Sequence, residues 1–176
     1  GDVAWEQGQR PLARRAYRQL ASNAQPDAES WQRLSELLSE DDPIDAAQAA
    51  TEVWLQTRQS HDFFRAVARF EQAQWQGDSQ RLWSSLTPDD VQRLSHWPAF
   101  FSARAQYWQR QGQTVQAVAD WKIALARQPR DETVLLGWLW ALLEQGQSRE
   151  LSAALKKQQH LANRVPALFA AAALQM

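Results

Sequence analysis

The apolar residues of this chain recur with a helical period, and glycine or proline interrupts them at regular intervals. The clearest segment is residues 101–129, in which Phe101, Ala105 and Trp108 are separated by four and then three residues. This spacing places the three side chains on one face of a helix. Gly112 follows, and a glycine just past a helix end takes the left-handed conformation at little cost. The pattern predicts a first helix that ends at Gly112.

A second helix is expected after this glycine. Thr114 is a suitable N-cap for it, and Pro129 is expected to end it. Its inner face is marked by residues at helical spacing: Ala117, Trp121, Ala124 and Leu125. The segment therefore predicts a helical hairpin.

The same pattern recurs along the whole chain. Turns between paired helices are expected, 34 or 35 residues apart, at Gly8, Asp42, Gly77, Gly112 and Gly146. The fifth residue after each turn residue is small or apolar: Ala13, Ala47, Leu82, Ala117 and Leu151. The ninth is larger in the first, second and fourth units, where it is Tyr17, Thr51 and Trp121. The match is looser in the third and fifth units, where Leu86 and Leu155 follow another leucine. Small and large residues in this order let paired helices approach and interlock, so the period predicts a tandem array of hairpins.

The period divides the chain, taken as a single array, into repeat units. Their approximate bounds are 1–26, 27–60, 61–97, 98–130 and 131–163, followed by a terminal helix at 166–176. Asp27 is expected to cap one helix, and Asp42 with Pro43 to begin the next. The apolar residues at 133–143 predict a helix that is covered on more than one side, with the alanine-rich terminal helix as part of its cover.

The third unit departs from the pattern. Its first helix is expected from about residue 61 to residue 75, but Thr87 and Pro88 interrupt the second one. Proline inside a helix costs about 3 kcal/mol, whereas Thr87 as a cap, Pro88 at the first position and the acids after it favour a new helix start. We predict a split helix, 79–86 and 88–95.

The unit at 101–129 resembles the tetratricopeptide repeat, a helix-turn-helix of about 34 residues. The signature positions of that repeat fall on Phe101, Ala105, Trp108, Gly112, Ala117, Trp121, Ala124 and Pro129. Arg104 is a departure, because the family usually has leucine there. The resemblance implies an all-α, right-handed superhelical solenoid of about four to five repeats, truncated at both ends. It also implies a non-catalytic scaffold for protein–protein interaction.

Composition excludes several classes of function. Lysine and arginine number 19 against 20 aspartates and glutamates, which gives no reason to expect nucleic acid or an anionic membrane as partner. Cysteine is absent, which excludes disulfides, thiolate metal sites and a cysteine nucleophile. No apolar run approaches the roughly 20 residues that span a bilayer, so we expect no direct membrane insertion of this chain.

The residues that could carry chemistry do not form a convincing site. His61, His96 and His160 lie in separate units and have no partner at metal-binding helical spacing. Glu36, Glu40 and Glu71 could face one groove as catalytic acids would, but acids on a solvated helix face are the ordinary case. We therefore predict no enzymatic activity, no cofactor and no metal.

A binding surface is predicted instead on the first helices, which line the concave surface in tetratricopeptide arrays. Glu36, Glu71, Gln106 and Trp140 occupy one position in four consecutive units, and we predict that they contact a partner. Two hypotheses for Trp140 remain open, because its indole could face this groove or pack on the terminal helix. Other tryptophans are in phase with inner positions and are expected in the core: Trp31, Trp54, Trp108, Trp121 and Trp138.

Two arginines also share a repeat position that is normally apolar. Arg69 and Arg104 are 35 residues apart. We expect their stems to fill the gap and their guanidinium groups to pair with acids, the alternative being an anion-binding ladder.

Residues 82–94, 100–113 and 135–151 carry a narrower resemblance, to the periplasmic tetratricopeptide region of outer-membrane export proteins of the Pel exopolysaccharide type. It implies a bacterial, periplasmic scaffold tethered to the outer membrane. Such a scaffold docks a polysaccharide deacetylase or hydrolase and guides the exopolysaccharide to the pore. The alternatives are the scaffolds of cellulose and poly-N-acetylglucosamine export, the superhelical domain of a cell-wall-cleaving enzyme, and a cytoplasmic adaptor.

Overall fold

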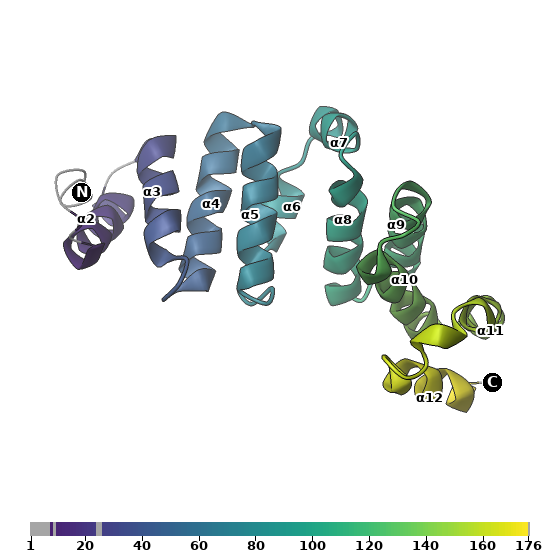
Figure 1. The fold of residues 1–176 in the computed structure, drawn as a ribbon. Coiled ribbons are helices and arrows are strands. Elements are labelled where there is room, and N and C mark those ends of the chain that lie inside the picture. The colour runs from purple at the N-terminus through teal and green to yellow at the C-terminus, as the bar shows by residue number, and fades with distance from the viewer. Residues whose placement is uncertain (1–7, 9, 24–25, 176) are drawn as a thin grey trace. The chain divides into compact units, whose positions relative to one another are not determined.

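The computed structural model describes residue 8, residues 10–23 and residues 26–175, and this part of the chain is all-helical (Figure 1). Its elements in chain order are α2 (Arg10–Asn23), α3 (Ala28–Leu38), α4 (Pro43–Thr57), α5 (Ser60–Gln72), α6 (Gln80–Ser84), α7 (Pro88–Leu94), α8 (Pro98–Arg110), α9 (Thr114–Arg127), α10 (Glu132–Glu144), α11 (Ser148–Lys157), the 3₁₀ helix η1 (Gln159–Leu161) and α12 (Pro166–Gln175). The predicted array of helical hairpins is confirmed. The helix expected before Gly8 lies outside the described residues.

Helices that follow one another along the chain pack against each other, as in α3 with α4, α4 with α5, and α8 with α9. The chain divides into two compact units, residues 1–94 and residues 95–176.

The predicted glycine turns are confirmed at the ends of α8 and α10. Gly112 and Gly146 have φ angles of 69° and 72°, in the left-handed region. After Gly112, the Gln113 N–H donates to the Trp108 carbonyl at 2.9 Å, while the Gly112 N–H donates to the Gln109 carbonyl at 3.0 Å. This pair of bonds satisfies carbonyl groups that a helix end otherwise leaves open.

The predicted N-cap at Thr114 is wrong by one residue. Thr114 is the first residue of α9, and Gln113 occupies the cap position without a side-chain capping bond. The reason is that Gln113 both donates back to the end of α8 and accepts the first bond of α9, from Ala117 N–H at 3.0 Å. The tight turn leaves no room for a separate capping residue.

The first helix of the third unit also ends earlier than residue 75. α5 ends at Gln72, and Gln74 and Trp75 take φ angles of 50° and 55° without being glycine. Trp75 N–H donates to the Phe70 carbonyl at 2.7 Å, and the Trp75 ring stacks on the Phe70 ring with centroids 5.9 Å apart. We attribute the early end to this aromatic stacking.

The core of residues 1–94 is built from aromatic side chains of successive helices. Phe63 of α5 is fully buried and makes edge contacts with Trp54 of α4 and Trp83 of α6, each with centroids 5.3 Å apart. Edge-to-face contacts of this kind are favourable beyond the area that they bury. The short helix α6 is thus held in place by its buried tryptophan.

The core of residues 95–176 surrounds α10, which packs against α8, α9, α11 and α12. This confirms the prediction from its nearly continuous apolar sequence. Gly137 lies where α10 meets Trp121 of α9, and a Cβ atom at Gly137 would come within 2.4 Å of the Trp121 ring. The glycine therefore permits a close approach between helix and indole, although its backbone is helical.

Candidate functional site

The four residues predicted to bind a partner all lie on first helices of hairpins. Glu36 on α3 and Glu71 on α5 are exposed, and both belong to residues 1–94. Gln106 on α8 and Trp140 on α10 are half-buried, and both belong to residues 95–176. Each of the four side chains thus keeps some solvent-accessible surface. That one partner contacts all four stays a prediction.

Gln106 and Trp140 lie on neighbouring helices. α8 and α10 are in contact, and the Gln109 amide donates to the Glu144 carboxylate at 2.9 Å. Gln106 and Trp140 each precede one of these bonded residues by about one helical turn. Both therefore lie on the face where α8 and α10 meet solvent, and that face is the best-defined part of the predicted surface.

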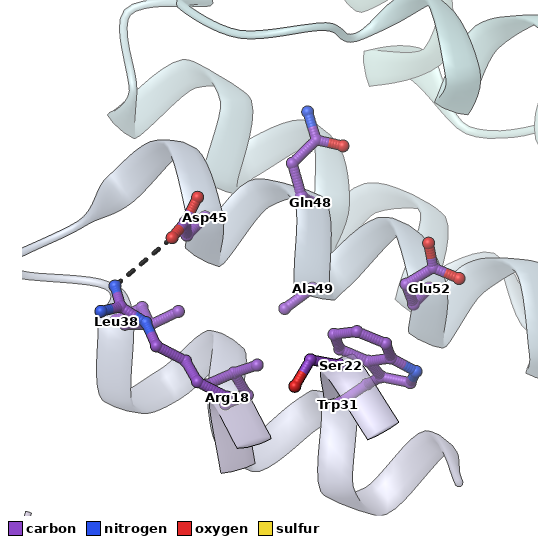
Figure 2. Close-up of a pocket in the computed structure, with 9 residues that line it drawn as sticks. Arg18, Ser22, Trp31, Leu38, Asp45, Gln48, Ala49 and Glu52 are labelled. Carbon is purple, nitrogen blue, oxygen red and sulfur yellow. Dashed lines mark hydrogen bonds and ion pairs between the residues drawn. The ribbon is translucent and has the colours of Figure 1, made fainter. Parts of the chain in front are cut away.

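The structure also contains a groove that the sequence did not predict, on the second helices of the hairpins. We call it the N-terminal groove (Figure 2). It has a volume of about 300 Å³ and is lined by Arg18, Ser22, Trp31, Leu34, Leu38, Asp45, Gln48, Ala49 and Glu52. These residues come from α2, α3 and α4, so the groove lies between two second helices, with α3 as its floor.

The charged residues at the rim of the N-terminal groove are already paired within the chain. Arg18 bonds to Asp45 at 3.3 Å, as Figure 2 shows, and also pairs with Asp42. Glu52 pairs with Arg81. The floor presents the half-buried indole of Trp31, which was predicted to lie in the core.

A second groove, the C-terminal groove, lies among residues 95–176. It has a volume of about 440 Å³ and is lined by Leu125, Pro129, Leu135, Trp138, Glu150, Ala153, Ala154, Lys157 and Gln158. The residues from α9 and α11 form its walls, and Leu135 and Trp138 of α10 form its floor. Trp138 is half-buried rather than fully enclosed in the core.

The two grooves occupy the same position in the repeat. Each lies between consecutive second helices, over the first helix that joins them in sequence. Positions can be compared by counting back from the turn residues Asp42 and Gly146. Trp31 then corresponds to Leu135, and Leu34 corresponds to Trp138. Sequence reasoning missed the grooves because it assigned all in-phase apolar residues to the core. The available signal was the small residues Ala49 and Ala153 on the second helices, which leave the floor uncovered.

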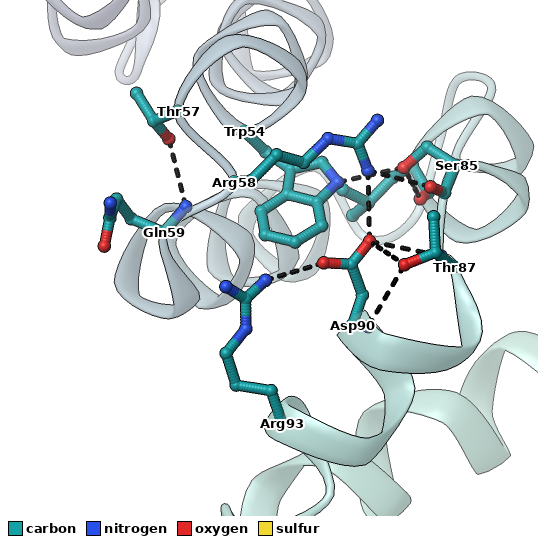
Figure 3. A network of polar contacts seen from close by, with 9 residues as sticks. Trp54, Thr57, Arg58, Gln59, Ser85, Thr87, Asp90 and Arg93 are labelled. Carbon is teal, nitrogen blue, oxygen red and sulfur yellow. Dashed lines mark hydrogen bonds and ion pairs between the residues drawn. The ribbon is translucent and has the colours of Figure 1, made fainter.

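The split of the third unit is confirmed as α6 and α7, and Figure 3 shows the polar network at the break. Thr87 N–H donates to the Asp90 carboxylate at 3.1 Å, and Asp90 N–H donates to the Thr87 hydroxyl at 3.2 Å. This reciprocal pair is a capping box with aspartate in place of glutamate. It explains how a helix can begin directly at Pro88.

The end of α4 is connected to this break by Arg58. Arg58 has a left-handed φ of 54°, and its guanidinium donates to the Ser85 carbonyl at 2.8 Å and to Asp90 at 3.3 Å. The Trp54 indole donates to the Ser85 hydroxyl at 2.9 Å, and Arg58 lies over the Trp54 ring, 5.2 Å from its centroid. Arg93 donates to the other Asp90 oxygen at 2.6 Å. The network fixes structure, and its groups bond to one another rather than facing a pocket.

The charge of Asp90 is favoured in the folded chain. Burial alone would raise the pKa of Asp90 and is the largest single effect. The bonds from the Thr87 backbone and hydroxyl, with the charges of Arg58 and Arg93, together outweigh burial and lower the pKa below its ordinary value of 3.8. The carboxylate is thus ionised at neutral pH.

This shift predicts a pH dependence of stability. A lowered folded pKa gives a stabilising contribution that is complete above 3.8 and is lost as the pH falls through the folded value. In urea unfolding of the wild type and Asp90→Asn, the difference in free energy of unfolding should be constant at neutral pH and shrink at pH values below about 4. A difference that stays constant into the acid range would contradict the assignment.

The prediction that Arg104 pairs with an acid is confirmed. Its guanidinium makes two bonds to Asp120, of 2.7 and 2.8 Å, and lies over the Phe100 ring, 5.0 Å from its centroid. The Trp108 indole also donates to Asp120, at 3.1 Å. For Arg69 the recorded bond is to the amide oxygen of Gln72 at 2.9 Å, so the predicted pairing with an acid is wrong there. Gln72 lies three residues later on the same helix, where side chains at this spacing are neighbours.

Within the described part of the chain, no group of three or more histidine, aspartate or glutamate side chains is arranged to hold a metal ion. His61 contacts the neighbouring Asp62 at 3.2 Å. None of the described helices is both long enough and apolar enough to cross a bilayer.

The arrangement of paired helices agrees with a comparison of the sequence with protein families. The model described as tetratricopeptide repeat matches residues 1–176. The chain belongs to the tetratricopeptide repeat family. Tetratricopeptide repeat domains are generally protein–protein interaction scaffolds and are typically non-catalytic. No curated protein matches the chain.

Proposed function

We propose that this tetratricopeptide repeat chain is a non-catalytic scaffold that binds a partner protein through the first helices of its hairpins. The observation that carries the proposal is the pair Gln106 and Trp140 on the contacting helices α8 and α10, where a half-buried indole keeps part of its surface in reach of solvent. Large aromatic side chains often dominate interface energies, at about 2 kcal/mol or more. Glu36 and Glu71 supply acidic contacts on the first helices α3 and α5.

The specific system that we propose is exopolysaccharide export of the Pel type. The support is the resemblance of residues 82–94, 100–113 and 135–151 to the periplasmic region of PelB, together with the helix break at Pro88 that the resemblance includes. In this proposal the chain is periplasmic and is joined to the outer membrane in a longer protein. It docks the deacetylase or hydrolase that modifies the polysaccharide and guides the polymer toward the pore.

The polymer itself is a second ligand in this proposal. A deacetylated amino-sugar polymer is cationic, and the exposed carboxylates of Glu36 and Glu71 would attract its amines. The half-buried Trp140 offers an aromatic face on which a sugar ring can stack. Protein docking is the primary function that we propose, since only two acids of the predicted surface would serve the polymer.

Binding measurements test this function. The purified chain should bind the periplasmic deacetylase of a Pel-type system, and Trp140→Ala should weaken binding by about tenfold or more. Glu36→Lys should weaken it less, because the carboxylate is exposed. Binding is measured by biolayer interferometry with the deacetylase and, separately, with a partially deacetylated amino-sugar oligosaccharide.

The control is Gln116→Lys, which adds a positive charge on the exposed surface of α9, a second helix. It should bind like the wild type. Circular dichroism should show unchanged helix content for all three variants. If Trp140→Ala unfolds the repeat, Trp140 is a core residue. If it folds normally and binds both ligands as the wild type does, the partner does not use this face.

A further inference from the structure

The C-terminal groove differs from the N-terminal groove in the charge at its rim. At the N-terminal groove, the charged side chains are paired within the chain, as described above. At the C-terminal groove, Glu150 is paired with Lys122 at 2.9 Å, which leaves this pair neutral. The Lys157 ammonium group has no ion pair or hydrogen bond to any residue that the structure describes. The rim of the C-terminal groove therefore carries one uncompensated positive charge.

The floor of the same groove is apolar and incompletely covered. Leu135 and Trp138 form this floor, Leu125 and Ala154 belong to the adjoining walls, and all four are only half-buried. An apolar cavity of about 150 Å³ can hold a benzene ring, so a groove of about 440 Å³ has room for more than one large apolar side chain. An apolar floor with a few polar groups at the rim is the usual composition of a binding groove.

We propose that the C-terminal groove docks an acidic amphipathic segment of a partner protein. The apolar side chains of that segment lie on the floor formed by Leu135 and Trp138, and one of its carboxylates faces Lys157. Charge complementarity selects this occupant, because a basic segment would be repelled by Lys157 and a purely apolar one would leave its charge without a counterpart. An amphipathic helix that lays its apolar face in a hydrophobic groove is a common mode of peptide recognition.

This docking surface is separate from the one in the proposed function. Its floor belongs to α10, the helix that also carries Trp140, but neither Gln106 nor Trp140 lines the groove. The two surfaces can therefore be tested independently. Failure of one proposal leaves the other in place.

The experiment uses two fluorescein-labelled amphipathic peptides of the same length, with leucine at helical spacing. One carries glutamate at its polar positions and the other carries lysine. Fluorescence anisotropy with the whole chain should show binding of the glutamate peptide and much weaker binding of the lysine peptide. Lys157→Glu should weaken binding of the glutamate peptide by about tenfold, because it places like charges together.

The matched control is Lys156→Glu, which makes the same charge change one residue earlier on α11. Lys156 is exposed and does not line the groove. Its substitution should change the affinity by about twofold at most. Equal losses in the two variants would overturn the proposal, since they would show a general charge effect. Unchanged binding in Lys157→Glu would also overturn it.

A second measurement locates the peptide. Since the chain has no cysteine, Ala153→Cys provides a single thiol in the groove for a nitroxide label. The label should broaden the NMR signals of the glutamate peptide more strongly than the same label at Val115→Cys, an exposed position outside the groove near the start of α9. Broadening only from Val115→Cys would place the peptide elsewhere and refute the proposal. Sedimentation showing a dimer that Lys157→Glu dissociates would make a second copy of the chain the occupant and refute it as well.

Discussion

Asp120→Ala is expected to lower the free energy of unfolding of residues 95–176 by about 3 kcal/mol. Asp120 is only 4% exposed and accepts bonds from Arg104 and Trp108. Without it, the Arg104 guanidinium, of which about a quarter is exposed, and the indole N–H of the half-buried Trp108 both lose their acceptor. Removing one partner of a buried ion pair leaves the other charge without a counterpart. The resulting loss of stability is larger than the net stabilisation that the intact pair provides. Urea unfolding followed by circular dichroism measures the loss.

Two further variants separate this explanation from a general loss of charge. Glu150→Ala removes a more exposed ion pair, with Lys122, and should cost about 1 kcal/mol or less. The double variant Arg104→Leu/Asp120→Ala removes both charges and should be more stable than Asp120→Ala alone. A double variant less stable than Asp120→Ala would show that Arg104 stabilises the fold mainly through its packing on Phe100 and Phe101.

Gly137→Ala is expected to destabilise the same unit by about 2 kcal/mol. Alanine in place of glycine inside a helix normally gains about 0.5–1 kcal/mol. Here the added Cβ would come within 2.4 Å of the Trp121 ring, which is 3% exposed and bonded through its indole N–H to Gln109 at 2.7 Å. The ring cannot move aside without losing both its packing and this bond. Overpacking of this kind costs typically about 1–3 kcal/mol, so the steric cost exceeds the gain in helix propensity.

The test is again urea unfolding, with a compensating variant as control. Trp121→Leu alone should destabilise the unit by removing a buried ring. Gly137→Ala added to Trp121→Leu should cost nothing further, and the helix propensity of alanine should produce a small gain. If Gly137→Ala is equally harmful with and without the Trp121 ring, the close approach is not the cause.

The fold was largely predictable from the sequence because the same pattern of apolar, small and turn residues recurs in successive repeat units. The turns at Gly112 and Gly146 and the break at Pro88 all rest on backbone preferences of single residues, which act locally. The errors arose where a neighbouring side chain decides the local structure. Trp75 ends α5 early by stacking on Phe70, and no backbone preference of Gln74 or Trp75 indicates this.

The candidate sites were less predictable, because helical period distinguishes inner from outer positions but does not give the degree of burial. Trp31 and Trp138 are in phase with the core, yet both are half-buried and line grooves. Whether such a residue is covered depends on the size of its neighbours on adjacent helices, here alanines at 49, 153 and 154. That information is distributed over three helices and becomes visible only when they are packed.

The network at Arg58 limits how the chain can be shortened. In an ideal repeat protein each hairpin contacts only its neighbours through similar interfaces, and the array tolerates removal of terminal units. Here the contact between neighbouring hairpins depends on specific bonds: Trp54 of α4 and Arg58, which follows α4, donate to Ser85 and Asp90 at the break in the second helix of the next hairpin. A fragment that stops at Thr57, the end of a hairpin, would leave the Trp54 indole without its acceptor and remove Arg58 altogether. A fragment that keeps the network must include α7, which ends at Leu94, so a shortened chain has to keep the second and third hairpins together.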